Sequence, residues 1–369
     1  MLNTMGIFFN KHIIAATTTC LLLVLTACSN DKKDGATFDT RQKARGENGE
    51  IILVITPEQW ESAIGKKIRD IFNAPIQGVP QEEPKYTLRK AAPSKLNSVL
   101  KASKNLLFVA TTNNNSAEGK YMKKYFTDNS IQQIEKNPKL FSFNQEDVYA
   151  RGQEVLYLFG RSEEELLKNL NEHEDQISGF FNAKEQKRLL VDLKKSAAKG
   201  IMNYISDSMG LELLVPYGYD ISTKSEDFIW VRALDNKEEF NIWVAKMPYN
   251  DEGLFDPENI KTIRNNLGKR YIKDIDDDSL YITTQNELPL VIDTVNLNGN
   301  YALETRGMWK YSDNSRGGSF ISYILADENT GQAYYIEGYL DNPGETKREP
   351  LRILETVLST ADIPDAIND

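Results

Sequence analysis

The chain has 369 residues, with 44 Lys and Arg against 54 Asp and Glu, and its formal net charge is −10. Hydrophobic residues make up 40% and charged residues 27%, which excludes wholesale disorder and predicts a sizeable buried core. An acidic chain offers no basic footprint for phosphates, so we expect no nucleic-acid partner.

Residues 1–27 are expected to be a signal peptide. Lys11 and His12 precede an apolar stretch over 13–25, which is too short to span a membrane as a helix. The segment Leu25-Thr26-Ala27-Cys28 resembles the lipobox of bacterial lipoproteins. That resemblance implies cleavage before Cys28 and attachment of a diacylglyceryl group to its thiol, so Cys28 is the expected lipid-attachment residue. The alternative is an ordinary secretory signal in which Cys28 has no role.

Ser29, the residue after the cysteine, resembles the variant that is sorted to the outer membrane. After cleavage the chain would keep one cysteine, Cys28, and one histidine, His173. With the thiol acylated, no cysteine nucleophile or cysteine metal site is expected. His173 lies in a highly charged helical stretch and is interpreted as a solvated residue. We therefore predict no catalytic, metal-binding or cofactor-binding residue.

Residues 28–49 are polar and of mixed charge, which predicts a flexible tether. An N-terminal α+β domain is predicted over 50–209, starting with a buried strand at 51–55. Thr56 and Gln59 form a capping box for the helix that follows. Proline-rich residues 73–84 predict a loop, and later elements are strands at 106–110 and 153–159, a helix opened by Ser162, and a helix over 183–209 that Gly210 ends.

A C-terminal α+β domain is predicted over 210–369. Two pairs of apolar strands, with the turn Asn298-Gly299 inside the first pair, indicate successive hairpins and an antiparallel sheet. A final helix over 349–360 would cover this sheet. The fold class is therefore α+β, with mainly antiparallel sheets and layered helices.

The acidic run Asp274, Asp276 and Asp278 imitates the start of a calcium loop. The positions that need glycine and glutamate hold Ser279 and Gln285, so we interpret the run as a solvated turn.

Phrases rich in turn and aromatic residues occur at 78–84, at 147–153 and at 306–309, the last followed by 317–320. They suggest a recognition surface built from guanidinium donors and aromatic rings. In the alternative interpretation, Trp309 fills the core and Arg306 pairs across the strands. The candidate binding residues are Tyr149, Arg151, Arg306, Trp309, Gly317 and Gly318.

Several phrases occur in the order found in the bacterial lipoproteins called domain of unknown function 4837. They are GVPQEEPKY (78–86), DVYARGQEVLYL (147–158), GNYALETRGMWK (299–310), GGSFISY (317–323) and the segment 334–358. The chain resembles that family from Gly49 to Ile363, with Met308 where leucine is expected. The resemblance implies a lipid anchor and an envelope location, and it brings no established activity.

The second half is similar, in the order of its elements, to the small α/β/α sandwich of PsbP-type photosystem assembly proteins, which are non-enzymatic. We therefore expect a lipid-anchored envelope protein that serves as a non-enzymatic binding or assembly-accessory module, with a protein partner. The alternative is a carboxylate-dependent hydrolase of envelope glycan or peptidoglycan, which needs two acids facing each other across a cleft.

Overall fold

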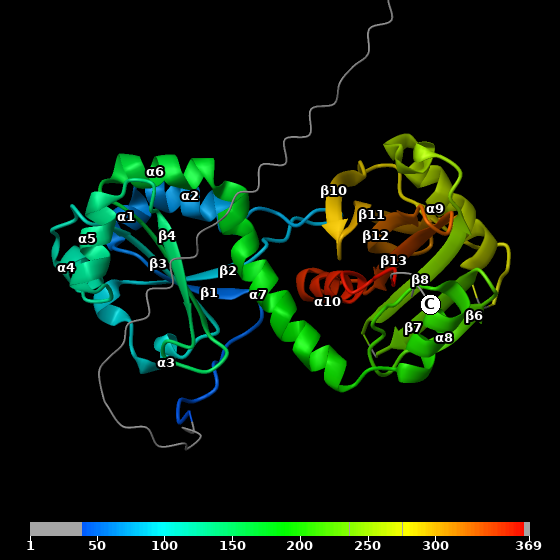
Figure 1. The fold of residues 1–369 in the computed structure, drawn as a ribbon, viewed down its shortest axis with the longest axis horizontal. Coiled ribbons are helices and arrows are strands. Elements are labelled where there is room, and N and C mark those ends of the chain that lie inside the picture. Colours follow the sequence, from blue (N-terminus) through cyan, green and yellow to red (C-terminus); the bar gives the residue numbers. More distant parts are fainter. Residues whose placement is uncertain (1–38, 236, 275, 365–369) are drawn as a thin grey trace, which may run out of the picture. The chain divides into compact units, whose positions relative to one another are not determined.

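The computed structural model describes residues 39–235, 237–274 and 276–364. Its strands form two separate sheets (Figure 1). The first has the order β2-β1-β3-β5-β4, and the second has the order β10-β11-β12-β13-β8-β7-β6, with β9 paired to β11. The predicted α+β class is confirmed. Cys28 lies outside the described residues.

The first sheet is parallel except for β4, which pairs antiparallel to β5 at the edge. This parallel pairing was not predicted; it follows from the helical crossovers that separate successive strands. The strands are β1 (Glu50–Val54), β2 (Thr87–Ala91), β3 (Asn105–Thr111), β4 (Ser142–Glu146) and β5 (Glu154–Gly160).

Helices cover both faces of the first sheet. One face packs against α2, α6 and α7 and the other against α4 and α5, because alternate strand residues point to opposite faces. The helices are α1 (Pro57–Glu61), α2 (Ala63–Phe72), α3 (Ser98–Lys101), α4 (Ala117–Lys123), α5 (Asp128–Lys136), α6 (Glu163–Glu172) and α7 (Glu174–Lys195).

The predicted capping residues are found at the ends of their helices, but one predicted helix is divided into two. The Thr56 and Ser162 hydroxyls accept hydrogen bonds from the backbone N–H of the residue three positions later, and Gly210 ends its helix at φ +73°. The predicted helix over 183–209 is instead the end of α7, a break at 196–198 and then α8 (Lys199–Met209).

The second sheet is antiparallel throughout, as predicted. The turn at Asn298 and Gly299 has positive φ at both residues, which suits a two-residue hairpin. The strands are β6 (Asp220–Lys224), β7 (Phe228–Leu234), β8 (Glu239–Pro248), β9 (Ile282–Thr284), β10 (Val291–Leu297), β11 (Asn300–Tyr311), β12 (Gly317–Asp327) and β13 (Gln332–Asp341).

Helices also cover both faces of this sheet. α8 and α10 (Arg348–Leu358) pack on one face, and α9 (Pro257–Tyr271) packs on the other. α10 is strongly amphipathic and buries Leu351, Leu354 and Val357, which confirms the predicted closing helix.

The segment between α2 and β2, residues 73–86, is called the connecting loop here. It folds back on itself through backbone hydrogen bonds between Ile76 and Glu83 and between Lys85 and Ala74. Ile76 and Val79 pack against the core of the second sheet, whereas Tyr86 belongs to the core of the first. The connecting loop thus takes part in both cores.

Residues 41–49, at the end of the predicted tether, also pack on the first sheet. Ala44 N–H donates to the Arg151 carbonyl and Arg45 N–H to the Ala102 carbonyl, both at 2.8 Å. Ala44 is 6% exposed. These residues of the predicted tether are therefore packed. Isolated β-bridges leave no apolar periodicity in a sequence, so this packing was not predicted.

Candidate functional site

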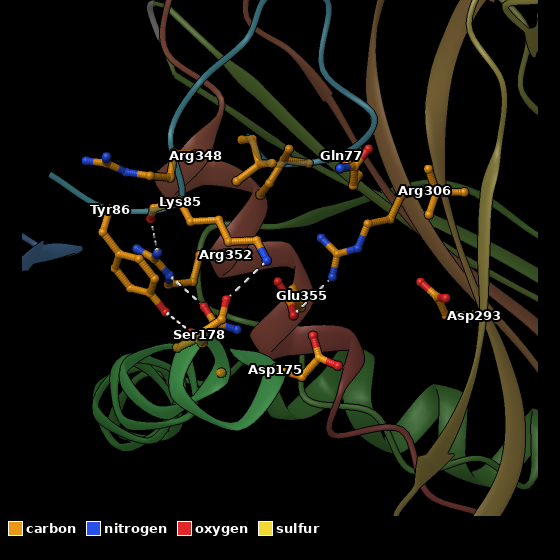
Figure 2. A pocket seen from close by; sticks show the side chains of 15 residues that line it. Gln77, Lys85, Tyr86, Asp175, Ser178, Asp293, Arg306, Arg348, Arg352 and Glu355 are labelled. Atoms are coloured by element: carbon orange, nitrogen blue, oxygen red, sulfur yellow. Dashed lines mark hydrogen bonds and ion pairs between the residues drawn. The ribbon is translucent and has the colours of Figure 1, made fainter. Parts of the chain in front are cut away.

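A cavity of about 320 Å³ lies against α10 and is called the α10 cavity here (Figure 2). The connecting loop, α7, β10 and β11 supply its other walls. Its charged lining consists of Lys85, Arg306, Arg348 and Arg352 on the basic side and Asp175, Asp293 and Glu355 on the acidic side.

Arg306 joins β11 to α10. Its Nε donates to Glu304 Oε1 at 2.6 Å, and one terminal nitrogen lies 3.1 Å from Glu355 Oε1. Burial alone would lower the pKa of the Arg306 guanidinium, but Glu355 and Glu304 raise it above its ordinary value. Arg306 is therefore a fixed cation that holds two carboxylates through Nε and one terminal nitrogen.

The two arginines of α10 are also engaged with protein acceptors. Arg352 Nε donates to Asn182 Oδ1 at 3.1 Å, and another of its nitrogens donates to the Lys85 carbonyl at 3.2 Å. Arg348 donates to the Pro84 carbonyl at 3.3 Å. These bonds hold the connecting loop and α7 against α10.

Two carboxylates of the α10 cavity are left open. Asp175 lies in the first turn of α7, and Asp293 lies on β10 opposite Glu304. Among the described residues, neither has a hydrogen bond or an ion pair, and both are exposed to solvent. Asp175 and Asp293 therefore offer open hydrogen-bond acceptors to the α10 cavity, which suit an ammonium, guanidinium or hydroxyl group.

A second cavity, of about 460 Å³, opens beside β4, β5 and α7 and is called the β4–β5 cavity here. Glu146 and Glu154 are directly opposite each other in the β4–β5 register, so their side chains share a face. Lys184 Nζ lies 2.9 Å from Glu146 Oε1 and 3.1 Å from Glu154 Oε1. The two carboxylates are therefore bridged by one ammonium group.

The same lysine leaves the two carboxyl groups with opposite pKa shifts. Burial raises the pKa of Glu154, and Lys184 only partly offsets this effect. The hydrogen bond from Lys184 lowers the pKa of Glu146, which is more exposed. Carboxyl groups with divergent pKa values are the pattern of an acid and base pair.

The inner wall of the β4–β5 cavity holds buried polar atoms without partners. Glu185, 1% exposed, accepts from the Gly49 backbone N–H at 3.2 Å and from Asn105 Nδ2 at 2.7 Å. Arg188 lies 3.1 Å from Glu185, yet its Nε has no hydrogen-bond partner among the residues that the structure describes. Glu154 Oε2 is likewise buried and unpaired. An unpaired buried polar group costs about 1–3 kcal/mol, which favours a bound water or ligand group here.

Tyr149 and Arg151 lie in the loop between β4 and β5. Arg151 lines the β4–β5 cavity, and its Nε donates to the Arg41 carbonyl at 2.9 Å. Tyr149 lines a third cavity of about 480 Å³, where Lys101 Nζ lies 5.2 Å from the centre of its ring. The two predicted residues therefore line different cavities.

Arg306 and Trp309 do not share a surface, which corrects the predicted recognition patch. They are three residues apart on β11, and an odd spacing places side chains on opposite faces of a strand. Trp309 is 2% exposed, and its Nε1 donates to the Leu340 carbonyl at 2.8 Å. The alternative interpretation of Trp309 as a core residue is what the structure shows. Arg306, in turn, pairs along its own strand and with α10 rather than across the strands.

Gly317 and Gly318 have a packing role beside that tryptophan. A Cβ atom on Gly318 would lie 2.1 Å from the Leu340 carbonyl oxygen, and one on Gly317 would lie 2.8 Å from the Trp309 carbonyl oxygen. Glycine is thus needed where β12 approaches its neighbours.

His173 stands between α6 and α7, with its ring stacked on Phe141 at 4.1 Å between centroids. It lines none of the cavities described above. In the acidic run, Asp274 accepts from the Asp276 backbone N–H at 2.9 Å, as in a self-capped turn. No group of three or more His, Cys, Asp or Glu residues suited to a metal ion occurs in the described ranges.

Sequence reasoning missed the carboxylates of both cavities. Glu146 and Glu154 meet only through the antiparallel register of a short edge strand. Asp175 and Asp293 are far apart in the chain. The phrase 78–86 contains no local signal that it folds beside α10.

The sequence comparisons divide the chain in two. Residues 198–360 match the family model described as Domain of unknown function (DUF4837), and residues 44–194 match the model described as Domain of unknown function (DUF8532). The match of residues 198–360 confirms the family that the phrases predicted, over that part of the chain. The match is narrower than the expected span from Gly49 to Ile363, because the first half matches a different model. No curated protein matches the chain.

Solved structures give distant likenesses. The Saccharomyces cerevisiae Ran-binding protein Mog1p is 9% identical, with a TM-score of 0.27, and the likeness covers 42% of this chain and 90% of that one. The human StarD13 lipid transfer and protein localization domain is 10% identical, with a TM-score of 0.20, over 43% of this chain and 95% of that one. In the part of the chain that the structure describes, no helix is both long and apolar enough for a membrane crossing.

Proposed function

We propose that this protein is a lipid-anchored component of the cell envelope, held to the outer membrane through Cys28, that acts as a non-enzymatic binding or assembly-accessory module. Its partner is another envelope protein that inserts a basic side chain into the α10 cavity. The anchor is inferred from residues 25–28 of the sequence alone.

The open acceptors of the α10 cavity carry this proposal. The three arginines of the cavity donate hydrogen bonds to protein oxygens. Asp175 and Asp293, in contrast, have no partner among the described residues. A lysine or arginine from a partner would meet two carboxylates in a cavity whose walls are already held in place, so little ordering would accompany binding.

The test is in-cell crosslinking of the lipidated protein followed by mass spectrometry. We expect the double substitution Asp175→Asn and Asp293→Asn to reduce capture of the partner at least tenfold. Asp128→Asn is the matched control, because Asp128 is also an exposed aspartate in the first turn of a helix. Equal capture by the wild type and the double variant would refute the role of the α10 cavity.

A second candidate function is a carboxylate-dependent hydrolase of envelope glycan. It is favoured by the facing pair Glu146 and Glu154, whose pKa values shift in opposite directions. Glu154→Gln should abolish release of reducing ends from peptidoglycan, whereas Glu238→Gln should not. Glu238 is a suitable control because burial raises its pKa as well, and it lies outside the β4–β5 cavity. If the wild type releases no reducing ends, this candidate fails.

A further inference from the structure

We propose that the β4–β5 cavity is a binding site for an acidic sugar, with the carboxylate of the sugar held by the basic rim and a hydroxyl group held at the inner wall. This inference goes beyond the leading proposal. It also names a substrate class for the second candidate function, the glycan hydrolase, and in that respect the inference rests on that candidate.

The charge of the cavity wall favours an anion. Seven basic and five acidic side chains line the β4–β5 cavity, although the whole chain carries a net charge of −10. Four of the acids are already engaged: Glu146 and Glu154 with Lys184, Glu185 with Arg188, and Asp192 with Lys195. The fifth, Asp147, accepts from the Gly152 backbone N–H.

Cations, by contrast, remain available at the rim. Lys43 and Lys187 have no ion pair among the described residues. A carboxylate entering the β4–β5 cavity would therefore find unpaired ammonium groups.

The inner wall calls for a group that both donates and accepts. Glu154 is 8% exposed and its Oε2 needs a donor, while the Nε atom of Arg188 needs an acceptor. A sugar hydroxyl supplies both functions, whereas inorganic phosphate at neutral pH is chiefly an acceptor. The volume of about 460 Å³ lies in the usual range of small-molecule sites.

Hydrogen bonds donated by side chains fix the shape of the β4–β5 cavity. Arg188 donates to the Gly152 carbonyl at 3.1 Å, and Lys104 Nζ donates to Asn48 Oδ1 at 2.7 Å. Gln153 Nε2 donates to the carbonyls of Lys101 and Ser103, both at 2.6 Å. The wall is thus tied together from four segments that are distant in the chain.

The experiment is isothermal titration of the full mature chain with glucuronate, glucose and inorganic phosphate. We expect glucuronate to bind at least tenfold more tightly than glucose or phosphate. Glu154→Gln should weaken glucuronate binding about tenfold, because it replaces one of the two acceptor oxygens of Glu154 by an amide NH2 group. Lys187→Met should weaken it about threefold to tenfold by removing a rim charge.

Lys194→Met is the matched control, because Lys194 is an exposed lysine of α7 that does not line the cavity. Lys187 is exposed, so its variant keeps the test valid even if Glu154→Gln fails to fold. Equal affinity for glucuronate and glucose would overturn the proposal. Phosphate binding as tight as that of glucuronate would also overturn it. Glucuronate binding that neither Glu154→Gln nor Lys187→Met weakens would overturn it as well, and would leave only a bound water at the inner wall.

Glucuronate has no glycosidic bond to break, so its binding is measured apart from hydrolysis. If glucuronate binds and peptidoglycan is not cleaved, the sugar site stands and the hydrolase candidate falls. If peptidoglycan is cleaved and glucuronate does not bind, the hydrolase stands and the acidic-sugar class is wrong.

Discussion

Lys184 contacts two glutamates of adjacent strands whose pKa values shift in opposite directions. It reaches Glu146 at the surface and Glu154 in a buried position. One ammonium cannot fully compensate the burial of Glu154, so the proton is held more tightly there than on Glu146. The difference arises at single residues and is measurable through the pH dependence of stability.

We expect Glu154→Gln to become relatively more stable as pH rises. Because burial raises the pKa of Glu154 above its ordinary 4.5, the wild-type chain loses folding free energy between that pH and the raised folded-state pKa. A glutamine stays neutral across this window. The difference in unfolding free energy between the variant and the wild type should therefore change in favour of the variant across this window, which urea denaturation at several pH values checks.

Glu146→Gln provides the opposite control. Lys184 lowers the pKa of Glu146, so the ionised carboxylate stabilises the fold above its ordinary pKa, and this stabilisation is lost as pH falls through the lowered value. The variant should be less stable than the wild type at neutral pH, by under about 1 kcal/mol because the side chain is half exposed. The same direction of pH dependence in both variants would contradict this assignment of the pair.

At the scale of elements, the close approach of β11, β12 and β13 depends on glycine. Trp309 on β11 lies against Gly318 on β12, and its indole N–H donates to the Leu340 carbonyl on β13. There is no space for a Cβ between the tryptophan and this carbonyl. The phrase 317–318 is thus part of the architecture of the second sheet.

Gly318→Ala should destabilise the protein by about 1–3 kcal/mol, because the added methyl group would overlap the Leu340 carbonyl oxygen. Gly200→Ala is the control, since nothing lies within 4 Å of a Cβ at that helical position and alanine favours helix. Thermal unfolding followed by circular dichroism would measure both. A Gly318→Ala variant as stable as the wild type would contradict the packing described here.

Local signals predicted most elements, and non-local contacts account for the differences. The apolar run 51–55, the caps at Thr56 and Ser162 and the hairpin turn at Asn298 are encoded within a few residues, and each was predicted. The exposed strands β2 and β4 carry no apolar alternation, so the register that brings Glu146 to Glu154 could not be derived from them. The same holds for the α10 cavity, where residues more than a hundred positions apart meet.

At the scale of the whole molecule, the connecting loop supplies the N-terminal cap of α10. The Glu83 carboxylate accepts from the backbone N–H groups of Lys347 at 2.9 Å and of Arg348 at 3.0 Å. Gly78, at φ +75°, lies against the backbone of Gly307 on β11. The free N–H groups of a helix start and its dipole both favour a carboxylate at this place.

Glu83→Ala should lower the free energy of unfolding by about 1–2 kcal/mol through loss of this cap. Glu82→Ala is the neighbouring control, because Glu82 is exposed and takes no part in the cap. Urea denaturation followed by tryptophan fluorescence reports on the second sheet, which holds Trp230, Trp243 and Trp309. Equal stability of the two variants would show that the cap contributes little.

Cys28→Ala should move the protein from the membrane fraction to the aqueous phase, because the proposed acyl chains are its means of attachment. Detergent phase partitioning and labelling with a fatty acid measure this. A variant that still partitions with membranes, together with a wild type that takes up no label, would refute the lipid anchor.

The Glu83 cap bears on how this chain can be divided and recombined. The boundary between the two family matches falls at residues 194–198, so a chimera that joins the second half to a foreign first half would naturally be cut there. Such a chimera would leave α10 uncapped and would remove Ile76 and Val79 from the core they pack against. Through Ile76, Val79 and Glu83, the connecting loop therefore packs on the half of the chain in which it does not lie. The transferable module is therefore discontinuous: residues 198–360 together with a graft of residues 73–86.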